Sequence, residues 1–448
     1  MKQNLDSKNI NQLLWQLSIP AILGMLSSAI FNIVDRIFVG KINSDALTAV
    51  GITMPVQVLQ MAFILLIGIG SSALVSIKLG EGKKEEAESI LYLAYRYIII
   101  FLILFAILFL VFIDQILAIL AISDSVMPYA KTYIVIIIVG SITGIPGYCL
   151  NNSLRAIGQA KTSMNIIIVT SILNIILDPI FIFVLRLGIA GAALATVISQ
   201  TVLTVYVVWA FKKRADFLIH LKRKKVENAR ELTRLGIKMG LPSFFVQLLA
   251  SAVNIFINYS LLRLGTDLDI ASVTIMSSIF SFYHMVVFGI VQGNNTICGY
   301  NWGAKHYDRI QKSLRLALMY AFGLSMLLFV VVQVAPQLLV RLFTDETPLI
   351  LSTSKSIRIY LMMLPFVGLQ TVSSQYFQAV GFAKKSSLLS FLRYGIFIVP
   401  AIIVLSPYGV KSVYISNAVS DALASIVAIV CIGIELKRLK QLEIKTRN

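Results

Sequence analysis

Long apolar runs, repeated along the whole chain, constrain the fold most strongly. An α-helix rises 1.5 Å per residue, so about 20 consecutive apolar residues cross the hydrocarbon core of a bilayer. The chain contains many runs of this length, only 13% of its 448 residues are charged, and its mean hydropathy is +0.85. The runs do not alternate apolar and polar residues as the strands of a membrane barrel do. The sequence therefore predicts an all-α integral membrane protein.

The apolar runs divide the chain into twelve expected transmembrane helices. Their approximate cores are residues 13–38, 47–77, 91–113, 130–152, 163–185, 188–211, 236–263, 270–298, 314–334, 355–380, 387–405 and 410–435.

An internal repeat relates the two halves of the chain. Pro20, followed twelve residues later by Asn32, returns as Pro242, followed twelve residues later by Asn254. Other pairs keep nearly the same separation: Gly70 with Gly293, Gly80 with Gly303, and residues 155–161 with residues 378–384. An even number of helices per repeat makes the repeats parallel, so we expect two pseudo-symmetric six-helix bundles, a transporter architecture. The expected boundaries are residues 1–211 for the first lobe, 212–234 for a basic linker and 235–448 for the second lobe.

The net charge is +18, and the basic residues are concentrated on one side of the expected membrane domain. Most of the 39 lysines and arginines lie in the two termini, in the linker 212–234 and in alternate short loops. The positive-inside rule therefore predicts that both termini and the linker are cytoplasmic, whereas the loops near Asp124 and Asp345 face outward. We interpret the basic run 222–225 as a topology signal that also contacts anionic lipid, and we expect no nucleic-acid partner.

Asn174 and Asp178 lie within a long apolar run, four residues apart, so their side chains share one helix face. A carboxylate at membrane depth costs several kcal/mol unless it faces a partner, an ion or a water-filled cavity. Asp178 therefore indicates a functional site, although packing through a hydrogen bond is the alternative.

Counting residues along the expected helices places other polar groups at the same depth. Asp178 is eight residues from Arg186, about 12 Å inward, and Thr196 is nine residues from Leu187, about 14 Å inward. Asp35 also reaches the outer half of the membrane, as does Tyr133. We therefore predict that Asp35, Tyr133, Asn174, Asp178 and Thr196 converge in the first lobe.

Two acids among neutral oxygen donors suit a proton or a hard cation such as Na⁺. Other interpretations remain open at single positions. Asp35 and its neighbour Arg36 could both lie near the membrane surface, and Asn174, Thr196 and Tyr133 could serve only as interhelical hydrogen bonds.

At these residues the chain resembles the multidrug and toxic compound extrusion (MATE) family. The resemblance covers Pro20, the segment 32–40, the segment 174–179 and the doubled six-helix layout. It implies export of organic cations and other amphipathic compounds, driven by inward H⁺ or Na⁺, without a cofactor. It also implies that Asp35, Asn174, Asp178 and Thr196 form a cation site, that Tyr133 and Asn151 lie beside it, and that the first helix bends at Pro20.

The second lobe departs from some family members, which carry cation-binding acids in helices seven and ten. Here those helices offer Gln247, Asn254, Gln370 and Gln375, so we expect no carboxylate site on them. Gln247 and Asn254, with Asn151, remain candidates for a polar substrate cavity. We expect Asp421 and Arg393 to form an ion pair, and His284 to be a hydrogen-bonded core residue.

Alternatives to multidrug antiport remain. A lipid-linked precursor flippase of the same superfamily would favour a basic cavity, and a major-facilitator transporter is faintly suggested by Asp35-Arg36. A scaffold or receptor would need no aligned buried acids. The chain is not expected to be an enzyme or to bind a metal through its three scattered histidines. We expect a monomer in a bacterial cytoplasmic membrane whose partners are lipid and small amphipathic or cationic molecules.

Overall fold

The computed structural model describes residues 5, 9–120, 122–222 and 228–447. Within these ranges the regular secondary structure is helical. Among the described residues, eleven helices are long and apolar enough to cross a membrane, or up to twelve if one bent pair counts as a single span. The predicted all-α membrane fold is therefore confirmed. Residues 223–227, which hold most of the basic run expected in the linker, lie outside the described residues.

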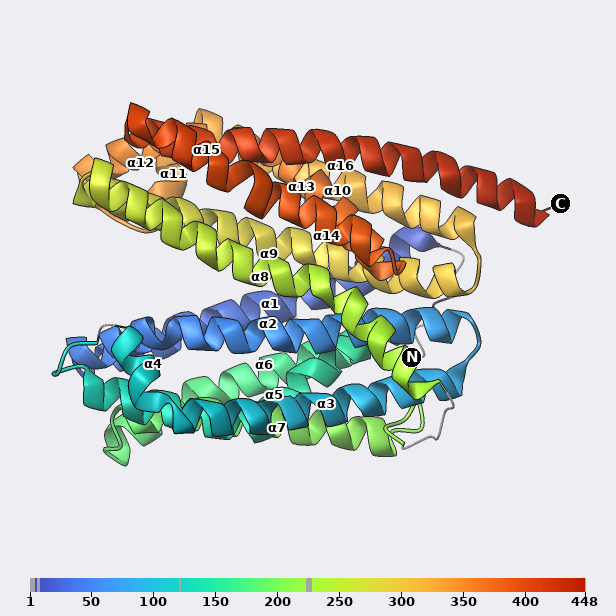
Figure 1. Ribbon diagram of the computed structural model, residues 1–448, viewed down its shortest axis with the longest axis horizontal. Coiled ribbons are helices and arrows are strands. Elements are labelled where there is room, and N and C mark those ends of the chain that lie inside the picture. The colour runs from blue at the N-terminus through green and yellow to red at the C-terminus, as the bar shows by residue number, and fades with distance from the viewer. Residues whose placement is uncertain (1–4, 6–8, 121, 223–227, 448) are drawn as a thin grey trace. The chain divides into compact units, whose positions relative to one another are not determined.

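The first half of the chain forms a series of long helices that run side by side, with the short α4 at one end (Figure 1). Their bounds are α1 (Ile10–Gly40), α2 (Ser44–Gly80), α3 (Lys84–Val111), α4 (Ile113–Ile119), α5 (Met127–Ala156), α6 (Ala160–Pro179), the π-helical turn η1 (Ile180–Val184) and α7 (Ile189–Lys213).

The second half repeats this succession with more interruptions. Its bounds are α8 (Ala229–Leu264), α9 (Asp267–Gly303), α10 (Tyr307–Val334), α11 (Pro336–Val340), α12 (Thr347–Tyr360), α13 (Leu364–Ala379), α14 (Ala383–Phe391), the π-helical turn η2 (Leu392–Phe397), α15 (Ile398–Leu405), the 3₁₀ turn η3 (Ser406–Tyr408) and α16 (Val410–Arg447).

The prediction of one continuous tenth helix over residues 355–380 was wrong. The structure begins it earlier, at Thr347, and breaks it into α12 and α13, whose axes differ by 52°. Pro365 stands at the start of α13. A proline has no N–H to donate and its ring crowds the carbonyl four residues earlier, so the helix cannot run through Leu361 unchanged.

The chain divides into two compact units whose boundaries fall inside two helices. Of the described residues, unit 1 contains residue 5 and those within 23–240, and unit 2 contains residues 9–22 and 241–447. The first part of α1 therefore belongs to unit 2, and the first part of α8 belongs to unit 1. Each helix changes unit within three residues of a proline, Pro20 in α1 and Pro242 in α8.

Small residues of the internal repeat hold these two helix segments in place. In unit 1 a side chain at Gly70 of α2 would overlap the backbone of Gly236 and Gly240 in α8. In unit 2 a side chain at Gly293 of α9 would overlap Ser18 of α1. Small residues let helix backbones approach closely in a membrane. The repeated glycines, Gly70 and Gly293, therefore mark equivalent helix crossings in the two units.

A row of glycines also packs α5 closely against α7 in unit 1. Side chains at Gly140, Gly144 or Gly147 would collide with α7 at Val197, Gln200 or Thr204, respectively. The Thr204 hydroxyl donates to the Gly144 carbonyl at 2.6 Å and accepts from the Gly147 N–H at 2.9 Å. Tyr133 and Thr196 therefore project from two closely packed helices.

The described start of the linker, residues 212–222, is held against unit 1. The Glu88 carboxylate of α3 accepts a hydrogen bond from the His220 backbone N–H at 3.0 Å. Arg214 donates to both carboxylate oxygens of Asp216, at 3.0 and 2.7 Å. These bonds lower the pKa of the Asp216 carboxyl below its usual value. The chain therefore leaves α7 through an ordered polar turn.

Candidate functional site

Two buried carboxyl groups form the centre of the candidate site in unit 1. Asp35 lies on the second part of α1 and Asp178 near the end of α6. The side chain of Asp178 is inaccessible to solvent, and Asp35 is also buried. The two carboxyl groups are close enough to interact directly. The structure thus brings together the two acids that the depth estimate placed in one half of the membrane.

Arg36 follows Asp35 in the sequence but does not neutralise it through an ion pair. Its side chain is exposed, and its guanidinium lies 3.5 Å from the Met54 sulfur. Within the part of the chain that the structure describes, neither Asp35 nor Asp178 pairs with a lysine or arginine. The Asp35 side chain is therefore buried, whereas that of Arg36 is exposed. The depth of the two residues in the membrane stays a prediction.

Asn174 joins α6 to α7 beside the acids. Its side-chain nitrogen lies 3.5 Å from the Asp178 Oδ1 and 3.4 Å from the Thr196 Oγ1. Asn174 is buried and Thr196 is half-buried. The one-turn spacing of Asn174 and Asp178 puts both side chains on the face of α6 that meets α7. The amide donor is shared between a carboxylate and a hydroxyl.

Tyr133 of α5 completes the group. Its buried ring lies near both Asp35 and Asp178, and its hydroxyl pairs with the Gln57 side chain of α2. The sequence reasoning missed Gln57. Its signal was available, because an amide within an apolar run two residues after Pro55 is another polar group at membrane depth.

Pro179 shapes the backbone directly after Asp178. It cannot donate a hydrogen bond, and α6 passes here into the π-helical turn η1, where the Leu185 N–H reaches the Ile180 carbonyl at 2.8 Å. Such turns occur often at functional sites because they alter the direction of side chains. Asp178 is thus held at a local irregularity of its helix.

Several buried oxygens of the site have no hydrogen-bond donor among the described residues. They are the Asp35 Oδ1, the Asp178 Oδ2 and the Asn174 Oδ1. A buried acceptor without a donor costs free energy, and this cost is greater for a carboxylate oxygen. Unpaired acceptors with surplus negative charge can be satisfied by a proton or a cation. The site is therefore chemically suited to loading and unloading a positive charge.

The remaining candidate residues lie on α5, α8 and the first part of α1. Asn151 of α5 is buried and its side-chain oxygen has no partner in the described structure. In unit 2, Gln247 of α8 is half-buried and Asn254, two turns further along the same face, is exposed. Pro20 is buried inside α1, at the place where this helix changes unit.

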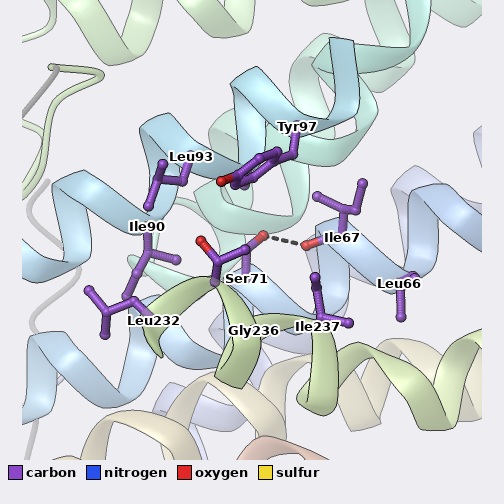
Figure 2. A pocket seen from close by; sticks show the side chains of 11 residues that line it. Leu66, Ile67, Ser71, Ile90, Leu93, Tyr97, Leu232, Gly236 and Ile237 are labelled. Atoms are coloured by element: carbon purple, nitrogen blue, oxygen red, sulfur yellow. Dashed lines mark hydrogen bonds between the residues drawn. The ribbon is translucent and has the colours of Figure 1, made fainter. Parts of the chain in front are cut away.

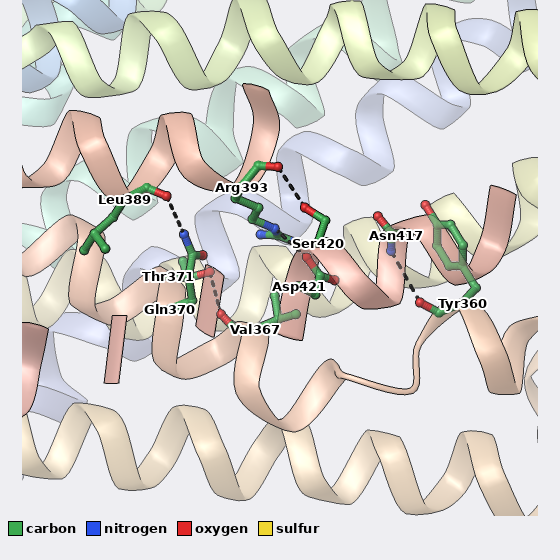
Figure 3. A network of polar contacts seen from close by, with 9 residues as sticks. All are labelled: Tyr360, Val367, Gln370, Thr371, Leu389, Arg393, Asn417, Ser420 and Asp421. Carbon is green, nitrogen blue, oxygen red and sulfur yellow. Dashed lines mark hydrogen bonds and ion pairs between the residues drawn. The ribbon is translucent and has the colours of Figure 1, made fainter. Parts of the chain in front are cut away.

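Unit 2 holds a different buried charged group, the ion pair of Arg393 and Asp421 (Figure 3). The Arg393 Nε donates to the Asp421 Oδ1 at 2.8 Å, and the Ser420 hydroxyl donates to the Arg393 carbonyl at 2.9 Å. Both charged side chains are almost fully buried. The expected ion pair between these residues is therefore present. Figure 3 also shows Gln370 reaching the Leu389 carbonyl, at 3.4 Å.

Comparison with known proteins identifies the family. The MatE family model matches residues 20–180 and 242–403, two segments that begin at the repeated prolines. Multidrug export protein MepA from Staphylococcus haemolyticus (strain JCSC1435) is 25% identical over 425 residues, which cover 94% of this chain and 93% of MepA. MepA from Staphylococcus aureus (strain MRSA252) gives the same identity and coverage.

Solved structures agree on the fold. A crystal structure described as MATE in the straight conformation has a TM-score of 0.91, 24% identity and coverage of 98% of this chain and 99% of the other. One described as MATE in the bent conformation has a TM-score of 0.90, 24% identity and 96% coverage of both chains. Because the family model matches both halves and more than half of the residues, this chain belongs to the MatE family of multidrug and toxic compound extrusion (MATE) transporters.

Proposed function

We propose that this protein is a secondary active antiporter that exports organic cations and other amphipathic small molecules in exchange for inward H⁺ or Na⁺. Membership of a multidrug efflux family and the multidrug export proteins among its relatives support the substrate class. The observation that carries the coupling step is the pair of adjacent buried acids in unit 1, which have unpaired acceptor oxygens and no basic ion-pair partner among the described residues.

Coupling requires a cation whose binding changes the relative free energies of two conformations. With the site open to the outside, Asp35 and Asp178 take a proton, or a Na⁺ that Asn174 and Thr196 help to coordinate. Loading removes the repulsion between the carboxylates and satisfies their unpaired oxygens. Release of the cation to the inside restores the repulsion. This cycle gives the ion gradient a differential interaction with two states of the first lobe. Tyr133 orients the acids, and Asn151, Gln247 and Asn254 contribute polar groups to the substrate path.

Pro20 is the proposed bending point of α1. A proline inside a helix removes one backbone hydrogen bond and lowers the cost of a kink. The helix changes unit two residues after Pro20, so bending there moves Asp35 relative to the part of α1 held in unit 2. Two solved structures that resemble this chain are described as MATE in the straight conformation and MATE in the bent conformation.

The proposal includes a location and an orientation. The chain works as a monomer of two six-helix lobes, residues 1–211 and 235–448 joined by the linker 212–234, in a bacterial cytoplasmic membrane. The basic termini and linker face the cytoplasm, in accord with the positive-inside rule.

Dye efflux from proteoliposomes tests the function. A cationic dye is loaded, and a pH gradient or a Na⁺ gradient is imposed separately, each with and without an ionophore that dissipates it. We expect one of the gradients to drive efflux and its ionophore to stop it. Equal dye movement with both gradients absent or collapsed would contradict antiport.

A further inference from the structure

A groove on unit 1 is lined by none of the candidate cation-site residues, so the proposed cation exchange does not explain it. It lies between α2, α3 and the first part of α8, and its cavity of about 290 Å³ is lined almost entirely by apolar side chains (Figure 2). Leu66 and Ile67 come from α2, Ile90 and Leu93 from α3, and Leu232 and Ile237 from α8. The only hydroxyl on α2 here, that of Ser71, is already bonded to the Ile67 carbonyl at 2.6 Å.

A second, polar cavity adjoins the groove and shares Tyr97, Thr233 and Ile237 with it. Its other lining includes Arg230, Arg234 and Lys238. These three follow one another at intervals of four residues, so they form one basic stripe along α8. Glu231, the one acid between residues 229 and 240, lines neither cavity.

Among the described residues, the basic stripe has no ion-pair partner. All three side chains are exposed, and within the ranges that the structure describes none takes part in an ion pair or a side-chain hydrogen bond. Long basic side chains extend their alkyl stems over apolar surface and keep the charge at the polar boundary. Tyr97, a residue that is 41% exposed, has the amphipathic character of residues at a membrane interface. The groove thus offers an apolar slot with a cationic rim.

We propose that this groove binds an anionic phospholipid of the cytoplasmic leaflet. An acyl chain occupies the apolar slot, and Arg230, Arg234 and Lys238 bind the phosphate-containing head group, with the Tyr97 hydroxyl beside it. The orientation proposed above places the start of α8 at the cytoplasmic surface, where anionic lipids attract basic clusters. Because the first part of α8 packs on α2 through Gly70 and Gly240, an occupant of the groove would brace this segment against unit 1.

Native mass spectrometry of the full-length protein in detergent tests the head-group contacts. Phosphatidylglycerol and phosphatidylcholine with identical acyl chains are titrated separately. The variant Arg230→Gln/Arg234→Gln/Lys238→Gln should weaken phosphatidylglycerol binding by roughly a hundredfold, since each basic residue near an anionic lipid contributes about a fivefold factor. Phosphatidylcholine binding should be nearly unchanged.

A matched control removes the same charge elsewhere. Lys437, Lys440 and Lys445 are exposed on the last turns of α16 and line neither cavity. Lys437→Gln/Lys440→Gln/Lys445→Gln should keep phosphatidylglycerol binding within a few-fold of wild type. Equal losses in the two triple variants would overturn the site, because they would indicate a general effect of net charge.

A third variant tests the apolar slot without changing charge. Gly236 lines the groove, and a Cβ added there meets no atom within 4 Å. We therefore expect Gly236→Leu to be accommodated and its side chain to occupy the slot. It should weaken binding of long-chain phosphatidylglycerol several-fold. Unchanged binding would overturn the acyl-chain assignment. Equal binding of both lipids by the wild type would also overturn the proposal. So would protein dimers that Gly236→Leu abolishes, because they would assign the groove to a second copy of the chain.

Discussion

The two units use their buried charges in different ways. Unit 1 places Asp35 beside Asp178 and gives neither an ion-pair partner in the described structure, whereas unit 2 pairs Asp421 with Arg393 at 2.8 Å. A duplicated scaffold has therefore become a lobe with surplus negative charge and a lobe that neutralises its charge internally. This difference is why we propose cation coupling in unit 1 and not in unit 2.

The internal repeat shows that these charges arose at different positions. Aligning Pro20 with Pro242 places Ile257 opposite Asp35, and aligning Pro179 with Pro400 places Val399 opposite Asp178. Aligning Gly188 with Gly409, both of which have positive φ, places Asp421 opposite Gln200. Unit 2 thus has apolar residues where unit 1 has its acids, and its own acid lies elsewhere. The Arg393–Asp421 pair is therefore not an altered copy of the candidate cation site.

The largest expected effect is on coupling. Asp178→Asn should abolish gradient-driven dye efflux from proteoliposomes, because a neutral amide can neither bind a proton nor attract Na⁺ with a full charge. Asp35→Asn should have a similar or milder effect. The protein should stay folded, and substrate binding should be partly retained.

A suitable control for coupling is Asp114→Asn. Asp114 is an exposed acid of unit 1, 2.7 Å from Lys131, and its replacement should leave efflux unchanged. If Asp35→Asn/Asp178→Asn still exported dye against its gradient at the wild-type rate, unit 1 would not be the coupling lobe, and Asp421 and His284 would be the next residues to test.

The second prediction concerns stability in unit 2. Arg393→Met leaves Asp421 buried without its partner and should lower the free energy of unfolding by about 3–5 kcal/mol. The double variant Arg393→Met/Asp421→Leu should recover most of this loss, because it leaves no unpaired charge. Thermal unfolding in detergent measures both. Equal destabilisation by the single and double variants would contradict this prediction, because it would show that the unpaired Asp421 charge is not the cause of the loss.

The third prediction, a milder effect, compares alanine substitutions of the two prolines at the unit boundaries. Pro20→Ala should lower the transport rate several-fold while leaving expression unchanged, because α1 carries Asp35 and bending moves it. Pro242→Ala should have less effect, since α8 carries Ile257 at the position opposite Asp35. Initial efflux rates normalised to reconstituted protein give the comparison. Full activity of Pro20→Ala would exclude bending at this position as a required step.

The residues of the candidate site in unit 1 could largely be predicted from the sequence, for a physical reason. The membrane imposes a common length scale, so counting residues along apolar runs placed Asp35, Tyr133, Asn174, Asp178 and Thr196 at one depth, and the structure brings them together in unit 1. Their roles in coupling remain a prediction. Depth alone does not give the direction in which a side chain points, which is why Gln57 was missed.

Other features escaped sequence reasoning because they depend on tertiary packing. The apolar pattern of α1 and α8 is continuous through Pro20 and Pro242, so nothing in it indicates that each helix changes unit. The repeated glycines were visible, but their function, the close crossing of two helices, requires both partners to be known. The break before Pro365 was readable from the proline alone, yet the surrounding apolar run outweighed it.

The smallest expected effect compares equivalent turns of the two repeats. Gly82 and Lys305 both have positive φ, 75° and 60°, and their N–H groups bond to the equivalent carbonyls of Leu79 and Trp302 at 3.1 and 3.2 Å. A residue with a Cβ pays about 1–2 kcal/mol in this conformation, and glycine pays none. Lys305→Gly should therefore raise the free energy of unfolding by up to about 1 kcal/mol, because part of the gain is lost to the greater freedom of glycine in the unfolded chain. Gly82→Ala should lower the free energy of unfolding by a similar amount.

Lys305→Ala is the control, because it removes the charge but keeps the backbone strain, and it should change the free energy of unfolding little. Denaturation in mixed micelles measures all three, and stabilisation by Lys305→Ala equal to that by Lys305→Gly would assign the effect to charge instead of backbone conformation.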